Sequence, residues 1–434
     1  MYKHLKPIFY KAVLLSMVLS LLAFTIALAA SGDLDTSFSG DGRVTTNFGL
    51  APGRADYLSG IAIQSNGKIV AVGSSSGDFA VTRYNVNGSL DTTFSGDGRV
   101  ITNFGGWENA NDVIMQSDGK IVVSGQKCPD AACDVALARY NANGMLDTTF
   151  SGDGKQTTDA GGDNGSEGGL AIQSDGKIVM AGYAWNGTDR EFAIYRYNTN
   201  GSLDTTFSGN GIAIGNFGVS RLDVTRDLAI QSDGKIIVVG NSADESGDDF
   251  DFAIARLNSN GTADTTFSGD GRQRTNFGGF DAVYSVALQP NGKIVVVGFR
   301  VTPTGSRTQF AVVRYNLDGS LDTTFNGTGR KAFSISSGFD SWASDVIVQS
   351  DGKIVVEGDI GQSGSSLDFA LVRLNPGGSF DTTFSGDGKI TVDFGGKAAF
   401  FALALDPLEG KYVVGGYFDP EIGTTDMALA RILP

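Results

Sequence analysis

Short runs of apolar and β-branched residues, punctuated by turn residues, fill nearly the whole chain after residue 30. The stretch "GIAIQSNGKIVAVG" (60–73) consists of two such runs joined by Asn66 and Gly67. Runs of this length and composition are typical of β-strands. Asn-Gly supplies the positive φ angles of a two-residue hairpin turn. The pattern therefore predicts two adjacent antiparallel strands joined by a two-residue turn.

Two further runs complete the unit. "FAVTRYN" (79–85) follows a variable loop and predicts a third strand, and "RVTTNF" (43–48), placed after "SGDG", predicts a fourth. No helical period lies between the runs. Four antiparallel strands without helices form the blade of a β-propeller. A β-solenoid fits less well, because its coils are shorter and lack these tight hairpins.

The unit is repeated along the chain. The phrase "LDTTF" or a variant of it begins at seven positions, 56 to 60 residues apart: Leu34, Leu90, Leu146, Leu203, Ala263, Leu321 and Phe380. This period is in the range of propeller repeats. The first copy supplies only a fourth strand and the last copy only three strands. We therefore expect one all-β, seven-bladed β-propeller over residues 31–434, closed by pairing residues 43–48 with 428–433, so that no sheet edge stays open.

The motifs "LDTTFSGDG" (90–98), "QSDGK" and "FAxxRYN" resemble the delta-60 repeat family, a family of bacterial, exported, propeller-forming repeats. The resemblance covers residues 34–434, and the strand order is similar to that of NHL-type propellers. It implies a propeller fold and export from the cell. It implies no agreed activity.

The repeated phrase has two interpretations. Its Asp, Ser and Gly residues at close spacing resemble a calcium loop, although the regular alternation of acids followed by a later Glu is absent. The same residues also make ordinary turns through side-chain to backbone hydrogen bonds. We favour the second interpretation, because every blade needs the same corner. The arginine of "RYN" then makes a blade-to-blade or turn contact in every copy: Arg83, Arg139, Arg196, Arg256, Arg314, Arg373 and Arg431. Calcium is the one cofactor left open, and no metal site is predicted.

Function is expected where the copies differ. The loops between second and third strands, and those that lead into the first strand, vary and lie on one face of the ring. The predicted ligand-binding residues are Trp107, Trp185 and Trp342 in these loops, together with Asp112, Asp227 and Asp345 just before the inner strands. Exposed tryptophans suit protein or sugar surfaces, and the alternative is that each tryptophan only caps its own blade. The aspartates are expected at the mouth of the channel, where they would hold a cation or a polar ligand, or are simply solvated.

The N-terminus carries Lys3, Lys6 and Lys11, followed by the apolar run 12–30. This pattern predicts a signal peptide over residues 1–30, with a retained membrane anchor as the alternative. Loss of the three lysines takes the net charge from −15 to −18, which disfavours nucleic acid and anionic membranes as partners. We expect a monomer that is not inserted in a membrane after signal removal, and that is secreted, periplasmic or held at the cell surface.

The chemistry of the chain is restricted. His4, the single histidine, is lost with the signal peptide, which excludes histidine-based catalysis and metal binding from the mature chain. Cys128 and Cys133 are predicted to form a local disulfide in an oxidising compartment. No catalytic motif is present, so the sequence predicts a non-enzymatic module that binds a carbohydrate or a surface protein. The alternatives are a histidine-free glycan hydrolase or lyase with two carboxylates less than about 10 Å apart, and a structural envelope component.

Overall fold

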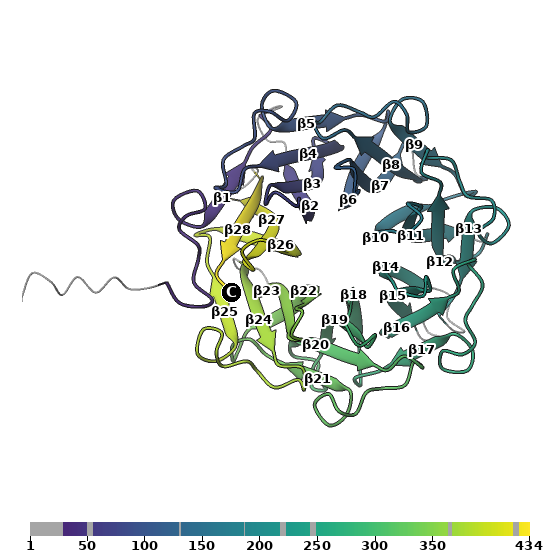
Figure 1. Ribbon diagram of the computed structural model, residues 1–434. Helices are drawn as coiled ribbons and strands as arrows, with labels where there is room; N and C mark the ends of the chain where they lie inside the picture. Colours follow the sequence, from purple (N-terminus) through teal and green to yellow (C-terminus); the bar gives the residue numbers. More distant parts are fainter. Residues whose placement is uncertain are drawn as a thin grey trace, which may run out of the picture.

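The computed structural model describes residues 29–49, 55–129, 132–185, 187–217, 223–243, 249–362, 367–419 and 425–434. The predicted signal peptide, residues 1–30, thus falls outside the described residues except for its last two. The described part is a ring of seven four-stranded antiparallel sheets (Figure 1). This confirms the predicted all-β, seven-bladed propeller. Within these residues no helix has the length and apolar character needed to cross a bilayer.

In each blade the first strand lies nearest the centre of the ring, and the other strands follow in order towards the outside. Blade 1 contains β2 (Asp56–Ile63), β3 (Ile69–Ser75), β4 (Asp78–Tyr84) and β5 (Arg99–Thr102). Blade 2 contains β6 (Trp107–Met115), β7 (Ile121–Cys128), β8 (Asp134–Tyr140) and β9 (Lys155–Thr158). Blade 3 contains β10 (Gly165–Ile172), β11 (Ile178–Trp185), β12 (Arg190–Tyr197) and β13 (Ile212–Gly215). Blade 4 contains β14 (Asp223–Ile230), β15 (Ile236–Ala243), β16 (Phe250–Leu257) and β17 (Arg272–Thr275).

The remaining blades follow the same order. Blade 5 contains β18 (Asp281–Leu288), β19 (Ile294–Val301), β20 (Thr308–Tyr315) and β21 (Arg330–Phe333). Blade 6 contains β22 (Asp340–Val348), β23 (Ile354–Gly361), β24 (Leu367–Leu374) and β25 (Lys389–Val392). Blade 7 contains β26 (Lys397–Leu405), β27 (Tyr412–Asp419) and β28 (Asp426–Ile432), and its outer strand is β1 (Arg43–Thr46).

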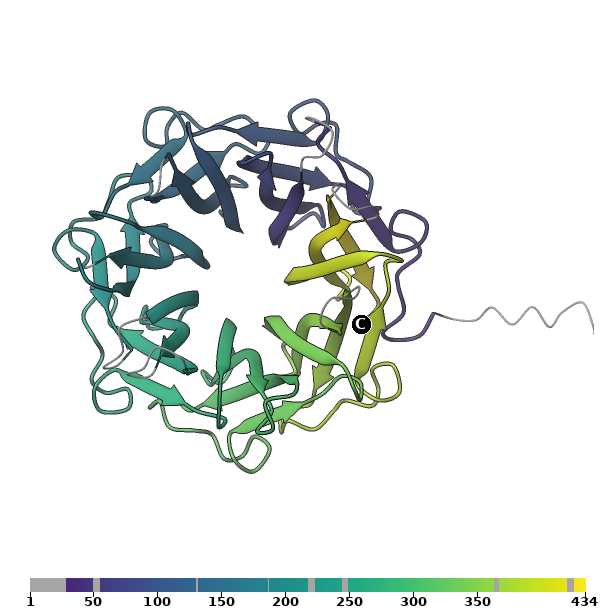
Figure 2. The same ribbon diagram turned by 180° about the vertical axis from the view of Figure 1, so that it is seen from behind.

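The ring is closed by the two ends of the described chain. β1 pairs with β28 in antiparallel register, from Arg43 opposite Ala430 to Thr46 opposite Met427. A further bridge joins Leu34 to Ile432. The same closed ring is seen from behind in Figure 2. The predicted pairing of the N-terminal strand with the last blade is therefore confirmed.

The hydrophobic core lies in the seams between blades. β3 reads IVAVGSS and is buried along its whole length, as expected for a strand covered on both faces. One core cluster combines Val70, Val72 and Phe79 of blade 1 with Val113 and Val123 of blade 2. Each blade therefore completes the core of its neighbour.

The inner hairpin turns differ in size from the predicted two-residue turn. In the first copy the backbone N–H of Gln64 donates to the carbonyl oxygen of Lys68 at 2.8 Å, which leaves Ser65, Asn66 and Gly67 as a three-residue loop. Gly67 has a φ of 79°, whereas Asn66 does not have a positive φ. A type I turn followed by one left-handed glycine has this geometry. The predicted hairpin is correct, and its loop is one residue longer than predicted.

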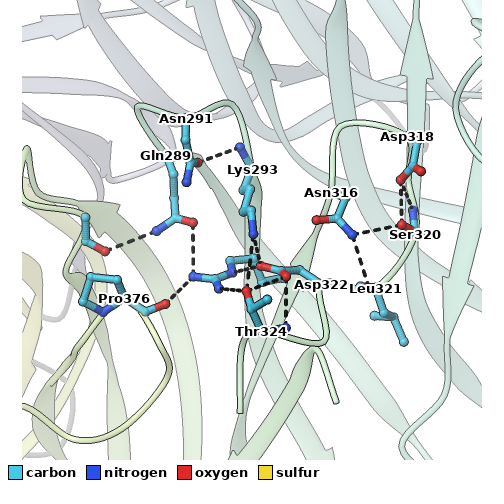
Figure 3. A network of polar contacts seen from close by, with 12 residues as sticks. Gln289, Asn291, Lys293, Asn316, Asp318, Ser320, Leu321, Asp322, Thr324 and Pro376 are labelled. Carbon is cyan, nitrogen blue, oxygen red and sulfur yellow. Dashed lines mark hydrogen bonds and ion pairs between the residues drawn. The ribbon is translucent and has the colours of Figure 1, made fainter. Parts of the chain in front are cut away.

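The repeated phrase forms a polar joint between adjacent blades (Figure 3). In blade 5, Asp322 accepts hydrogen bonds from Arg314 Nε at 2.6 Å and from Lys293 Nζ at 2.6 Å. Its other oxygen accepts the Thr324 hydroxyl and backbone N–H. Arg314 Nη1 also donates to the carbonyl oxygen of Pro376 in blade 6. The predicted blade-to-blade role of this arginine is confirmed, and the phrase serves the architecture.

The antiparallel order places the connections of each blade on two faces of the ring. We call the face with the loops between second and third strands, and with the loops into the inner strands, the variable face. The uniform face carries the inner hairpin turns and the turns that follow the third strands, such as 65–67 and 86–88.

Candidate functional site

A hollow of about 260 Å³ occupies the centre of the ring and is lined by residues from all seven inner strands. The strands bring their side chains there through β-bulges. The register of β6 shifts between Ala110 and Asp112, and β14 and β22 shift at the equivalent place, immediately before Asp227 and Asp345. A bulge bends a strand and re-aims the neighbouring side chains. The structure thus brings the three predicted aspartates together around the channel.

Each of these aspartates joins two blades. Asp112 accepts the backbone N–H of Val113 at 2.7 Å and that of Leu170, in blade 3, at 2.9 Å. The other two make the same pair of contacts. Asp227 accepts from Leu228 and Val286, and Asp345 accepts from Val346 and Leu403. The carboxylates therefore fasten the inner strands to one another around the channel.

Ser285 connects two of the three carboxylates. It stands in β18 where Asp112, Asp227 and Asp345 stand in their own strands. Its hydroxyl lies 2.9 Å from Asp227 Oδ2 and 2.7 Å from Asp345 Oδ1. The two carboxylate oxygens are thus no further apart than the sum of these distances, which is below the limit of about 10 Å for paired acids.

The channel raises the pKa values of these three acids. Burial away from water raises the pKa of Asp112 to about 7, of Asp227 to about 8 and of Asp345 to about 6. The neighbouring carboxylate of Asp345 adds to the shift of the other two. At neutral pH the group therefore carries less than its full negative charge.

Two aromatic residues of the channel wall escaped the sequence prediction. Tyr284 and Phe401 occupy the bulged positions of β18 and β26 and remain 36% and 43% exposed. Tyr284 stacks on Phe299, with ring centroids 6.1 Å apart, and Phe401 lies 5.9 Å from Tyr417. The bulged position differs in most copies, but the two columns before it vary as much, so variability alone does not single it out: Ser59, Asn111, Gly168, Arg226, Tyr284, Ser344 and Phe401.

A second hollow, of about 490 Å³, adjoins the first on the variable face between blades 2 and 3. Both hollows are lined by Asn111 and Arg226. Trp107, 55% exposed, forms part of its wall. The wall also includes the disulfide between Cys128 and Cys133. The two hollows form one continuous surface that runs from the channel to Trp107.

The polar groups of this second hollow are held in place by each other. Arg190 pairs with Asp163 at 2.7 Å and lies over the ring of Tyr183, 4.4 Å from its centroid. Asn109 donates from its side-chain amide to Asn111 Oδ1 at 2.6 Å. Groups fixed in this way lose little freedom when a ligand binds.

The predicted tryptophans do not gather. Trp107 begins β6, Trp185 ends β11, and Trp342 lies inside β22, on blades 2, 3 and 6. Placing them in loops was wrong, because the strands extend further towards the variable face than the sequence pattern indicated. Trp185 is 41% exposed but lies outside both hollows, and Trp342 is half-buried. Only Trp107 belongs to the hollow surface.

Among the residues that the structure describes, no group of three or more His, Cys, Asp or Glu side chains is arranged to hold a metal ion. Each predicted aspartate instead accepts backbone N–H groups from two blades.

Several solved structures are similar to this chain. A protein of unknown function from Dyadobacter fermentans is 14% identical, covers 90% of this chain and 98% of its own, and has a TM-score of 0.46. An ulvan lyase of a polysaccharide lyase family is 12% identical, with coverages of 93% and 94% and a TM-score of 0.48. A gluconolactonase from Xanthomonas campestris is 14% identical, with coverages of 94% and 98% and a TM-score of 0.37. At this level of similarity no activity is carried over to the present chain.

None of the curated proteins matches the sequence. The family model described as "Domain of unknown function (DUF5122) beta-propeller" matches six segments: residues 64–94, 116–150, 173–207, 231–267, 289–325 and 349–384. Each segment runs from an inner hairpin turn to the repeated phrase of the same copy. With the seven-bladed ring, these matches identify the chain as a member of a β-propeller repeat family, similar to the DUF5122 propellers.

Proposed function

We propose that the protein is an exported, monomeric binding module that takes a carbohydrate at the channel mouth on its variable face. The observation that carries this proposal is the continuous surface formed by the two adjoining hollows. It combines exposed aromatic rings with fixed amide, hydroxyl and carboxyl groups, which is the combination that sugar rings with apolar faces and hydroxyl edges require. The disulfide between Cys128 and Cys133 is in keeping with an oxidising compartment outside the cytoplasm.

A glycan array probed with the chain lacking residues 1–30, followed by calorimetry on each hit, tests the proposal. Trp107→Ala and Phe401→Ala each remove one aromatic wall and should weaken binding about tenfold or more. Trp185→Ala is the matched control, because Trp185 is an exposed tryptophan of the neighbouring blade outside both hollows. Binding that is lost in the control but unchanged in the other two variants would place the ligand elsewhere. If the chain bound a surface protein and no glycan, its ligand would be a protein and not a carbohydrate.

A second candidate function is a glycan hydrolase or lyase that uses Asp227 and Asp345. The short path between their oxygens through Ser285 favours it. Both carboxyls also accept backbone N–H groups, so a catalytic role would have to coexist with their role in fastening the blades. Incubation of each array hit with the wild-type chain, and with Asp227→Asn and Asp345→Asn, decides the matter. Shortened products from the wild type alone would support an enzyme. Intact glycan in all three samples would leave the binding module.

A further inference from the structure

The uniform face has hollows of its own at the seams between blades. One, of about 500 Å³, lies between blades 1 and 2, and another, of about 470 Å³, lies between blades 3 and 4. Their walls come from equivalent positions of the repeat. Gln64, Arg83 and Gln116 in the first hollow correspond to Gln173, Arg196 and Gln231 in the second. The repeat therefore builds the same hollow twice.

One position of the repeat carries a small side chain at both of these seams. It is the residue between the two asparagines of the turn after the third strand, Ala142 in blade 2 and Ser259 in blade 4. This residue faces the glycine of the inner hairpin turn in its own blade. A methyl group built on Gly119 would meet nothing within 4 Å, and one built on Gly234 would lie 3.6 Å from Ser259.

Larger side chains stand at this position in four other blades. A methyl group built on the corresponding turn glycine would lie 3.0 Å from Val86, 3.1 Å from Thr199, 2.9 Å from Leu317 and 3.4 Å from Pro376. In the seam of blades 5 and 6, Gln289 donates to the carbonyl oxygen of Gly352 at 3.2 Å and accepts from Arg314 at 3.4 Å (Figure 3), and Arg196 makes the equivalent bond to Gln173 at 3.5 Å in the seam of blades 3 and 4. Side chains larger than Ala142 and Ser259 at this position thus narrow the space beside the turn glycine.

The open hollows offer hydrogen-bonding atoms that the protein does not use. The Oε1 atoms of Gln64 and Gln116, which line the first hollow, are buried without a partner among the described residues, and so is Oε1 of Gln231 in the second. Gln231 is only 8% exposed. A buried acceptor without a partner costs free energy that a ligand donor would recover.

The cations of the hollows are paired within the protein. Arg83 and Lys68 share Asp91 at 2.6 Å and 2.7 Å, and Arg196 pairs with Asp204 at 2.8 Å. Met115 and Ile230 add an apolar patch to the respective walls. A neutral ligand with several hydroxyl donors and a small apolar face matches this surface better than an ion does.

We propose that the seams of blades 1/2 and 3/4 are two equivalent sites for a neutral, hydroxyl-rich molecule of monosaccharide size. These sites lie on the uniform face and are independent of the binding surface at the channel mouth. The residue at position 142 or 259 decides whether each site exists.

Equilibrium dialysis with radiolabelled methyl glucoside, galactoside and mannoside counts the molecules bound per chain. Ala142→Leu and Ser259→Leu fill the hollows with the side chain that blade 5 carries at this position, Leu317. Each variant should lose one bound molecule, and the double variant should lose two. Leu317→Ala should open the seam of blades 4 and 5 and add one. Melting temperatures near that of the wild type show that the variants are folded.

The number of molecules bound per chain distinguishes these sites from the channel mouth. When Trp107→Ala and Phe401→Ala are added to both chains, the chain with Ala142→Leu and Ser259→Leu should still bind two molecules fewer than the chain without them. This result is expected even if the proposed function fails. The same count in the wild type and in the Ala142→Leu/Ser259→Leu double variant would overturn the inference. So would a wild type that binds none of the three methyl hexosides.

Discussion

The aspartates of this protein serve in two opposite electrostatic environments. Burial alone would raise the pKa of Asp322, but hydrogen bonds from Lys293 and Thr324 and the charge of Arg314 hold it below its usual range. In the channel, burial and the neighbouring carboxylates of Asp345 and Asp112 raise the pKa of Asp227 to about 8. A partner cation in one case and neighbouring carboxyls in the other decide the direction.

Asp322→Asn should lower the free energy of unfolding by about 3 kcal/mol, because it leaves the buried Arg314 and the partly exposed Lys293 beside a neutral group. Urea denaturation at pH 7 measures the change. Because the carboxylate is more acidic when folded, its contribution is present above an unfolded pKa of about 3.9 and lost as the pH falls below it. Asp318→Asn is the matched control, since Asn stands at the equivalent position in four other copies. Equal losses of stability in both variants would contradict the role of Asp322 in joining the blades.

The buried side chain of Glu357 leads us to expect that the stability of the fold falls as the pH rises. Its side chain is fully buried in β23 opposite Asp345, and neither carboxyl oxygen has a partner among the described residues. Burial raises its pKa well above the usual range, and the charges of Asp359 and Asp345 raise it further. The protonated form is thus favoured in the folded state, so its stabilising effect is complete below an unfolded pKa of about 4.3 and declines as the pH rises above it.

The wild-type melting temperature should therefore fall between pH 5 and pH 9, and Glu357→Gln should reduce that fall. The amide keeps the shape of the protonated acid without a charge to bury. Differential scanning calorimetry at both pH values measures the difference. The exposed Asp351→Asn of the same blade should leave the fall unchanged. A Glu357→Gln profile that matches the wild type would rule out a buried, protonated Glu357.

Among the elements, strands and hairpins were predictable because alternation and Asn-Gly or Asp-Gly turns recur in most copies. The size of the inner turn was not, since it depends on the Gln64–Lys68 backbone pair. The bulges escaped because one inserted residue leaves no break in a short apolar run. Asp112, Asp227 and Asp345 line the channel because they keep a fixed distance from the hairpin, and their role in ligand binding stays a prediction. Tyr284 and Phe401 were missed because they look like ordinary strand residues.

A pair of glycines in blade 2 separates backbone strain from blade packing. Gly144 and Gly152 have φ angles of 89° and 93°, so alanine costs about 1–2 kcal/mol at either position. A methyl group on Gly144 would also lie 3.1 Å from the ring of Phe94 in blade 1, whereas one on Gly152 would meet nothing within 4 Å. Gly144→Ala should therefore cost about 1–3 kcal/mol more than Gly152→Ala in urea denaturation. Equal losses of stability in the two variants would mean that the Phe94 ring moves away from the new methyl group at no cost.

For the whole molecule, stability depends on neighbours in a circle. Each core cluster combines residues of two blades, as that of blades 1 and 2 does. A blade without its neighbour would leave half of such a core in water. The closing pair of β1 and β28 therefore protects every seam, including those far from the chain ends.

A chain that begins at Gly49 lacks β1 and the residues that bond to blade 7, such as Asp35, which pairs with Arg431 at 2.7 Å. It should melt at a lower temperature and self-associate through the open edge of β28. Calorimetry and light scattering measure these changes against a chain that begins at Ser31. An unchanged melting temperature and a monomeric mass would show that the ring closes without β1.

The closing pair also fixes how the ring responds to tension. The N-terminal end of β1 lies beside the C-terminal end of β28, and the backbone N–H of Gly32 donates to the carbonyl oxygen of Leu433 at 3.0 Å. A pull on the two chain ends therefore loads one hydrogen bond after another, as in opening a zipper, and does not load the whole strand pair in shear. If a cell surface and a bound partner held opposite ends of the chain, a small force would open the ring at the junction of β1 and β28 first.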